Sequence, residues 1–166
     1  MRAVGLFLAM TVLAVLAACG PPSKFRSYHG PAVTFVVVEK SQRKMYLLHH
    51  DKVLKSYDIG LGFAPEGHKQ FEGDGKTPEG LYFIDRRNPD SRFHLSVGLS
   101  YPNEADREFA KAEGKSPGGD IFIHGKGPRH QKARGDWTEG CIWVTDREIE
   151  DIYAMVRDGT PIQINP

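Results

Sequence analysis

The stretch His124–Val144, HGKGPRHQKARGDWTEGCIWV, is the most informative part of this 166-residue chain. Cys141 directly follows a glycine in Thr138-Glu139-Gly140-Cys141, and His124 closes the short apolar run Ile121–Ile123. A cysteine and a histidine at the ends of neighbouring strands can form a thiolate–imidazole pair, the core of a cysteine nucleophile. The spacing therefore predicts Cys141 as a nucleophile and His124 as its base, with the imidazole lowering the thiol pKa.

The N-terminus is typical of an export signal. A positive start is followed by an apolar run, Ala3–Leu16, which is too short and wrongly flanked for a membrane span. Leu16-Ala17-Ala18-Cys19 resembles the bacterial lipobox, which implies cleavage before Cys19 and acylation of its sulfur. We therefore expect a lipoprotein signal peptide over 1–18 and a lipidated tether over 19–32, although a plain secretory signal remains the alternative. The expected location is the periplasm-facing cell envelope, and the outer membrane in a Gram-negative cell.

The cysteine count agrees with a reactive thiol. The chain has two cysteines, so acylation of Cys19 would leave Cys141 without a disulfide partner. A lone thiol in an oxidising compartment is a liability unless it is used, the alternative being a buried cysteine that packs as a small hydrophobe. Removing the signal, with Arg2 as its one charged side chain, takes the formal charge from +1 to zero. This balance argues against nucleic acid as a partner.

The remaining chain is predicted to form one mainly β domain over 33–166. A long glycine-rich loop, 60–80, is expected to form a lid or wall over a cleft, or else to be solvated and disordered. A capping box, Thr145 with Glu148, opens a helix that ends near Gly159. Apolar and β-branched runs predict strands at 33–38, 44–48, 53–59, 81–85, 93–99, 120–124, 141–144 and 162–164, and composition predicts a helix at 104–113.

Four segments together resemble the YkuD-type L,D-transpeptidases. Lys76-Thr77-Pro78-Glu79-Gly80-Leu81-Tyr82, Pro117–Gly125, Thr138–Cys141 and Val144–Asp146 occur in the order typical of that family, and the likeness runs from about Val33 to Pro166. It implies a β-sandwich or open barrel of YkuD type with one or two short helices, in a chain that we expect to be monomeric. It also implies a catalytic domain over 33–166 that needs no metal or organic cofactor.

The resemblance further implies a substrate, the peptidoglycan stem peptide. In that family the cysteine attacks the carbonyl of the third residue of a donor tetrapeptide, usually meso-diaminopimelate, and expels the terminal D-alanine. An amine then resolves the acyl-enzyme, which gives a 3→3 cross-link or attaches an envelope protein. By the same resemblance Gly140 and Cys141 supply oxyanion amides, the Gly125 carbonyl orients His124, and Thr138 holds the turn or binds substrate.

Two positions depart from the commonest family pattern. That pattern has a histidine two before the cysteine and an arginine two after it, where this chain has Glu139 and Trp143. The lost cation would bind a substrate carboxylate. Arg129 and Arg134 in the basic loop can replace it, or can be ordinary solvated charges, and Trp143 can belong to the cleft wall or to the core.

The departures leave three functions open: transpeptidation, hydrolysis by the same pair as an L,D-carboxypeptidase or amidase, and wall binding without catalysis. The histidines show no metal-ligand spacing.

Overall fold

The computed structural model describes residues 23–166, so the predicted signal peptide and Cys19 lie outside the described residues. The strands are β1 Phe35–Glu39, β2 Lys44–His49, β3 Lys52–Asp58, β4 Gly80–Asn88, β5 Ser96–Leu99, β6 Phe122–His124, β7 Ile142–Trp143 and β8 Pro161–Asn165, and the helices are α2 Glu104–Ala112 and α3 Asp146–Met155.

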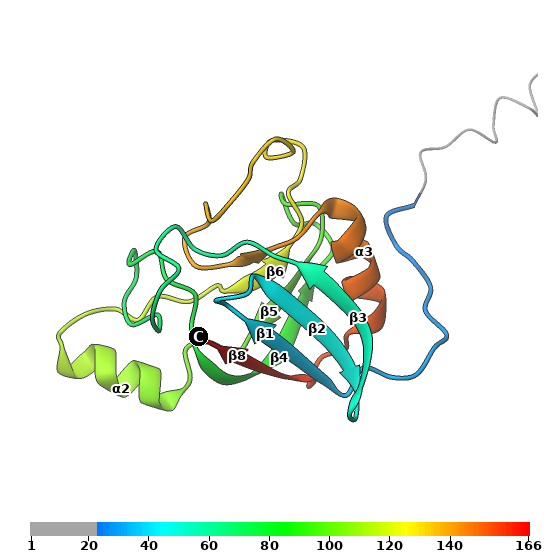
Figure 1. Ribbon diagram of the computed structural model, residues 1–166. Coiled ribbons are helices and arrows are strands. Elements are labelled where there is room, and N and C mark those ends of the chain that lie inside the picture. The colour runs from blue at the N-terminus through cyan, green and yellow to red at the C-terminus, as the bar shows by residue number, and fades with distance from the viewer. Residues whose placement is uncertain (1–22) are drawn as a thin grey trace, which may run out of the picture.

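The strands form one eight-stranded sheet in the order β3-β2-β1-β8-β4-β5-β6-β7. The pairs β1–β8 and β6–β7 are parallel, and the other neighbouring pairs are antiparallel. Figure 1 shows the sheet curling round, with α3 beside it and α2 standing apart. The curled sheet with two short helices confirms the prediction of a mainly β, open-barrel fold.

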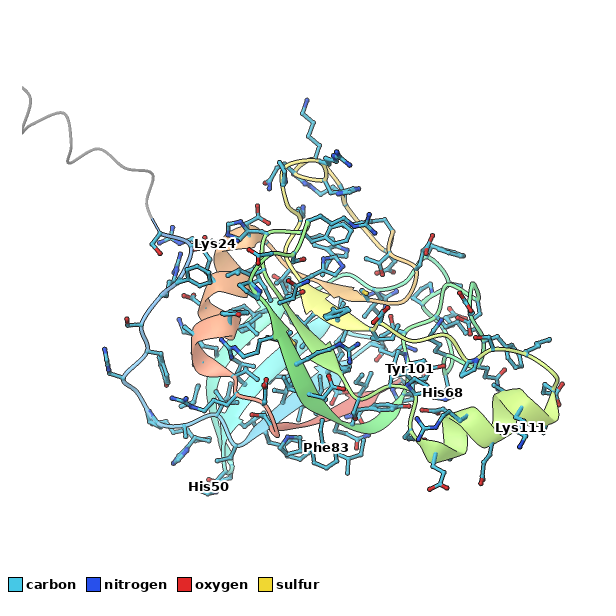
Figure 2. All side chains as sticks on the ribbon, turned by 180° about the vertical axis from the view of Figure 1, so that it is seen from behind. Lys24, His50, His68, Phe83, Tyr101 and Lys111 are labelled. Atoms are coloured by element: carbon cyan, nitrogen blue, oxygen red, sulfur yellow. The ribbon has the colours of Figure 1, made fainter. Side chains whose placement is uncertain are left out.

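Side-chain alternation explains which face of the sheet is buried. Val36 and Val38 of β1 and Ile162 and Ile164 of β8 are fully buried, because alternate strand residues point to the same face. Each such side chain contributes about 1.5–3 kcal/mol to folding. The opposite face carries more exposed residues, among them Phe83 of β4, which points away from the core (Figure 2).

Helix α3 forms as its sequence predicts. Thr145 is the N-cap, and the reciprocal capping box with Glu148 is present. Ile149, Ile152 and Met155 are buried, and the helix packs against β5 and β6. Its N-terminus therefore lies beside the strand that ends at His124.

Helix α2 connects the long loop to the core. Its Asp106 accepts hydrogen bonds from the Tyr82 hydroxyl at 2.9 Å and from His68 Nε2 at 3.0 Å. His68 and Tyr101 lie beside this helix in Figure 2. The loop is also held by Lys40, whose buried Nζ donates to Gly67 O at 2.7 Å. The loop 60–80 is thus ordered by specific contacts, which contradicts the alternative of a disordered loop.

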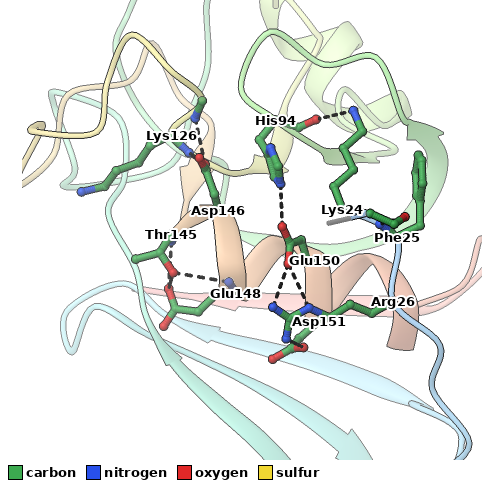
Figure 3. Close-up of polar contacts among 12 residues, drawn as sticks. Lys24, Phe25, Arg26, His94, Lys126, Thr145, Asp146, Glu148, Glu150 and Asp151 are labelled. Carbon is green, nitrogen blue, oxygen red and sulfur yellow. Dashed lines mark hydrogen bonds and ion pairs between the residues drawn. The ribbon is translucent and has the colours of Figure 1, made fainter. Parts of the chain in front are cut away.

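The described part of the predicted tether, 23–32, is docked on the domain. Arg26 forms ion pairs with Glu150 and Asp151 of α3, both at 2.7 Å, and Lys24 Nζ donates to the His94 carbonyl at 3.3 Å (Figure 3). Lys24 Nζ also donates to the Pro89 carbonyl at 2.6 Å. Within residues 23–166, no helix is both long and apolar enough to cross a bilayer.

Candidate active site

Cys141 and His124 line one cleft of about 800 Å³. Strands β6 and β7 are parallel, with Ile123 opposite Ile142 and His124 opposite Trp143. Because strand side chains alternate, Cys141 just before β7 lies on the same face of the sheet as His124. The structure therefore brings together the two residues that the sequence paired.

The Cys141 thiol is held by backbone groups of the preceding strand. Its Sγ accepts a hydrogen bond from the Phe122 amide at 3.4 Å, and the thiol donates to the Asp120 carbonyl at 3.5 Å. Burial among protein atoms raises the pKa of the thiol to about 11, an effect that outweighs the Phe122 amide. The thiol is therefore protonated at neutral pH.

His124 is a buried and neutral imidazole. Only 2% of the residue is exposed, and the Phe93 ring stacks on it with centroids 4.3 Å apart. Nδ1 lies 2.5 Å from the Gly125 carbonyl, which can only accept, so Nδ1 carries the proton and Nε2 has the free lone pair. Burial lowers the pKa of His124 to about 4.

The resting pair is therefore a neutral thiol and a neutral imidazole. The sequence predicted that the imidazole would lower the thiol pKa, whereas in the folded protein burial raises it. The free Nε2 of His124 still leaves it able to take a proton during attack.

A model of the YkuD family, described as the L,D-transpeptidase catalytic domain, matches residues 33–164. The chain belongs to this family. Among curated proteins, the chain is similar to "Putative L,D-transpeptidase YafK" of Escherichia coli (strain K12). The two sequences are 27% identical over 94% of this chain and 64% of that protein. The chain thus spans less than two thirds of that relative.

Solved structures carry the same fold. The helical cell shape determining protein Pgp2 from Campylobacter jejuni has a TM-score of 0.62 and 25% identity, over 90% of this chain and 53% of its own. Bd1075 from Bdellovibrio bacteriovorus has a TM-score of 0.56 and 26% identity, over 85% of this chain and 50% of its own. An L,D-transpeptidase from Mycobacterium smegmatis shares the fold with a TM-score of 0.55 and 17% identity, over 81% of this chain and 59% of its own.

The turn that carries the cysteine of this YkuD domain is fixed by Thr138. Its hydroxyl donates to the Cys141 carbonyl at 2.6 Å and accepts from the Gly140 amide at 3.3 Å. Gly140 has φ +133°, and a Cβ there would lie 2.6 Å from the Lys76 carbonyl, so glycine is required. The Gly140 amide is occupied, which leaves the Cys141 amide as the candidate oxyanion donor of this turn.

Asp146 was not predicted as a site residue, although it lies beside the capping box. Its Oδ1 accepts from the amides of Lys126 at 2.7 Å and Gly127 at 2.8 Å (Figure 3). These amides directly follow the Gly125 carbonyl that bonds His124. A Cβ at Gly125 would lie 2.6 Å from Asp146 Oδ1, so this close approach requires glycine. Asp146 thus holds the peptide that orients His124.

The loop 60–80 forms one wall of the cleft through Lys69, Glu72 and Gly73. The Asp74 carboxylate organises this wall, because it accepts from Lys69 Nζ at 2.8 Å, from Gln70 N at 2.8 Å and from the amides of Phe71 and Lys76. The expectation of a wall agrees with this arrangement.

The predicted substrate-binding residues lie outside the cleft lining. Arg129 and Arg134 are exposed, and the Arg134 guanidinium donates to the Ala133 carbonyl of its own loop at 2.9 Å. Trp143 donates through Nε1 to the Gly135 carbonyl at 2.9 Å, with the Lys126 ammonium 4.3 Å from the ring centroid. These three side chains serve the loop rather than the cleft surface.

Sequence reasoning missed the other wall. Asn88 at the end of β4 and Ser91, Arg92 and Phe93 of the β4–β5 turn line the cleft, as does an aromatic pair, His130 stacked on Trp137 at 4.7 Å. No local pattern indicates Asn88, Ser91, Arg92 and Phe93, since they reach the cleft only through the sheet order. Within residues 23–166, no group of three or more His, Cys, Asp or Glu could hold a metal ion.

Proposed function

We propose that this protein is a peptidoglycan L,D-transpeptidase in which Cys141 is the nucleophile and His124 the base. The observation that supports the proposal is the shared cleft, which is lined both by a thiol and by an imidazole with a free Nε2 in a YkuD domain. The substrate is the stem peptide, cut after its third residue.

In the proposed reaction Cys141 Sγ attacks the carbonyl carbon of the donor's third residue while His124 Nε2 takes the thiol proton. The imidazolium then gives that proton to the nitrogen of the leaving D-alanine, and the C–N bond breaks to leave a thioester. The Cys141 amide donates to the oxyanion in both steps. An amine of a second stem peptide attacks the thioester, His124 accepts the amine proton, and it returns the proton to the departing thiolate.

Hydrolysis is the second candidate, and Glu139 is the observation that favours it. In place of the family's common histidine, this exposed carboxylate lines the cleft two residues before Cys141. A carboxylate there can hold a water molecule beside the thioester. Water instead of an amine would then resolve the acyl-enzyme, and the product would be a tripeptide.

We propose further that the protein is a monomeric lipoprotein of the periplasm-facing envelope, anchored through acylated Cys19. It would act in cell wall organisation and in cell shape, and cell shape is what the similar protein Pgp2 is described as determining. The support is the lipobox-like sequence before Cys19. Replacing Cys19 by Ser should release the protein from the membrane fraction, and unchanged retention would refute the anchor.

The deciding experiment incubates the purified protein with a disaccharide-tetrapeptide donor and analyses the muropeptides by mass spectrometry. Transpeptidation predicts 3→3 dimers and released D-alanine. Tripeptide without dimers would favour hydrolysis. The Cys141→Ala variant should yield neither product, and equal turnover by that variant would refute the nucleophile assignment.

A further inference from the structure

The β4–β5 turn forms the end of the cleft next to the proposed base. Asn88, Ser91 and Arg92 line the cleft, and the next residue, Phe93, stacks on the His124 ring. The turn is braced from outside, because Lys24 Nζ donates to the Pro89 carbonyl at 2.6 Å. The backbone of this turn therefore holds these polar side chains in the cleft lining, next in sequence to the ring that stacks on His124.

In this turn the side-chain oxygens already accept hydrogen bonds, so the side-chain groups that remain unpaired are donors. Asn88 Oδ1 accepts from the Asp90 amide at 2.9 Å, and Ser91 Oγ accepts from the Phe93 amide at 3.2 Å. This leaves the Asn88 amide group, the Ser91 hydroxyl proton and the Arg92 guanidinium, none of which donates to another group among the described residues. A set of free donors around a guanidinium is suited to an anion, and above all to a carboxylate.

The charges of the cleft give the anion one place to bind. Lys69 is the other lysine or arginine of the lining, but its ammonium is 2.8 Å from the Asp74 carboxylate and so is neutralised. Near Cys141 the lining carries the carboxylates of Asp120 and Glu139, of which Asp120 is 3.3 Å from Arg86 and Glu139 has no ion pair among the described residues, and Glu72 adds a further carboxylate to the lining. These carboxylates repel an anion from the thiol end, whereas Arg92 attracts it to the His124 end.

We propose that Arg92, with Asn88 and Ser91, is a subsite for the side-chain carboxylate of the donor's third residue. The inference rests on the proposed function and extends it to substrate choice. Arg92 would take over the role of the arginine of the common family pattern, whose position in this chain is occupied by Trp143. Bound there, a third residue with a free carboxylate is held beside His124 with its carbonyl toward Cys141. The subsite thereby selects a diamino acid with a free carboxylate over one whose carboxylate is amidated or absent.

The test compares two tetrapeptide donors that differ only at the third residue, one with the free carboxylate and one with the primary amide. Arg92→Gln is the test variant and Arg129→Gln is its matched control, because Arg129 is exposed in a loop outside the cleft lining. The rate of D-alanine release gives kcat and KM for each combination of protein variant and donor.

Wild type and Arg129→Gln should prefer the free carboxylate, and Arg92→Gln should raise KM for it about 10- to 100-fold, the range for losing hydrogen bonds to a charged group. For the amide donor Arg92→Gln should change KM less than about twofold, and Arg92→Lys should recover part of the preference. Equal losses on both donors, or no loss on either, would overturn the subsite while the turnover itself upholds the proposed function. No turnover of either donor by wild type would instead refute the proposed function.

Discussion

The protonation state of Cys141 makes a measurable prediction about its reactivity. Burial raises the pKa of this thiol from the ordinary value of 9.0 to about 11. At pH 7.5 a free thiol is then ~3% ionised and Cys141 only ~0.03%, which is about a 100-fold smaller thiolate fraction. In the Cys19→Ser variant Cys141 is the one remaining cysteine, so alkylation by iodoacetamide reports on it alone.

The smaller thiolate fraction is partly offset by the higher nucleophilicity of the Cys141 thiolate. A more basic thiolate attacks faster with a Brønsted slope of roughly 0.4–0.5, so two pKa units raise the intrinsic rate about 8-fold. The expected second-order rate at pH 7.5 is therefore about one tenth of that of a free cysteine peptide. It should rise about tenfold for each pH unit up to pH 9, with no plateau below pH 10.

The assay follows the mass of the intact protein against time between pH 6 and 9, where the fold is expected to persist. The matched control is His124→Ala, whose alkylation rate should change less than about threefold because the resting imidazole carries no charge. A plateau below pH 8 in wild type that disappears in His124→Ala would show a thiolate–imidazolium pair. That result would refute the assignment of a neutral pair.

Three further predictions concern the surroundings of the pair. Thr138→Val removes both hydrogen bonds of the turn and should lower the free energy of unfolding by about 1–3 kcal/mol in urea titrations, whereas Thr138→Ser should stay near wild type. Asp146→Ala should lower D-alanine release about 10- to 100-fold by freeing the peptide after Gly125, and Asp151→Asn, a carboxylate change on the same helix, should not. The pKa of His124, lowered by burial to about 4, means that between about pH 6.5 and 4 the unfolded chain binds a proton that the folded protein does not. Stability should therefore fall by about 3 kcal/mol as the pH drops through that window, and a His124→Gln variant should lose this component.

Local patterns in the sequence predicted the parts of the fold that depend on near neighbours. The capping box at Thr145 and the apolar runs that form β1 and β8 require only a few consecutive residues, and the structure has them. The predicted strand 93–99 was partly wrong, because β5 begins at Ser96 and His94 has φ +80°. The residues before Ser96 form the cleft wall instead of extending the strand, which no short-range pattern indicates.

The candidate site was likewise predicted only in part from the sequence. The order of motifs was enough to place Cys141 and His124 in one cleft, because both lie at the ends of short strands. The cation of the cleft was not predicted, since Arg92 lies in the sequence far from the basic loop that holds Arg129 and Arg134. It reaches the cleft because β5 pairs with β6, and that pairing joins residues distant along the chain.

The two pKa shifts together favour forward breakdown of the tetrahedral intermediate. In the proposed reaction a His124 imidazolium, whose pKa is about 4, is a strong acid toward an amine, so it would protonate the leaving D-alanine nitrogen readily. A thiolate whose conjugate acid has a pKa of about 11 is a poorer leaving group than an ordinary thiolate, so return to the donor peptide is slowed. The same thiolate must leave when the thioester is resolved, and there the imidazolium formed from the attacking amine or water supplies the proton. Because His124 would do this for either acceptor, we expect the pair to set the rate of acyl-enzyme formation, and the choice between cross-linking and hydrolysis to depend on what the Glu139 side of the cleft admits.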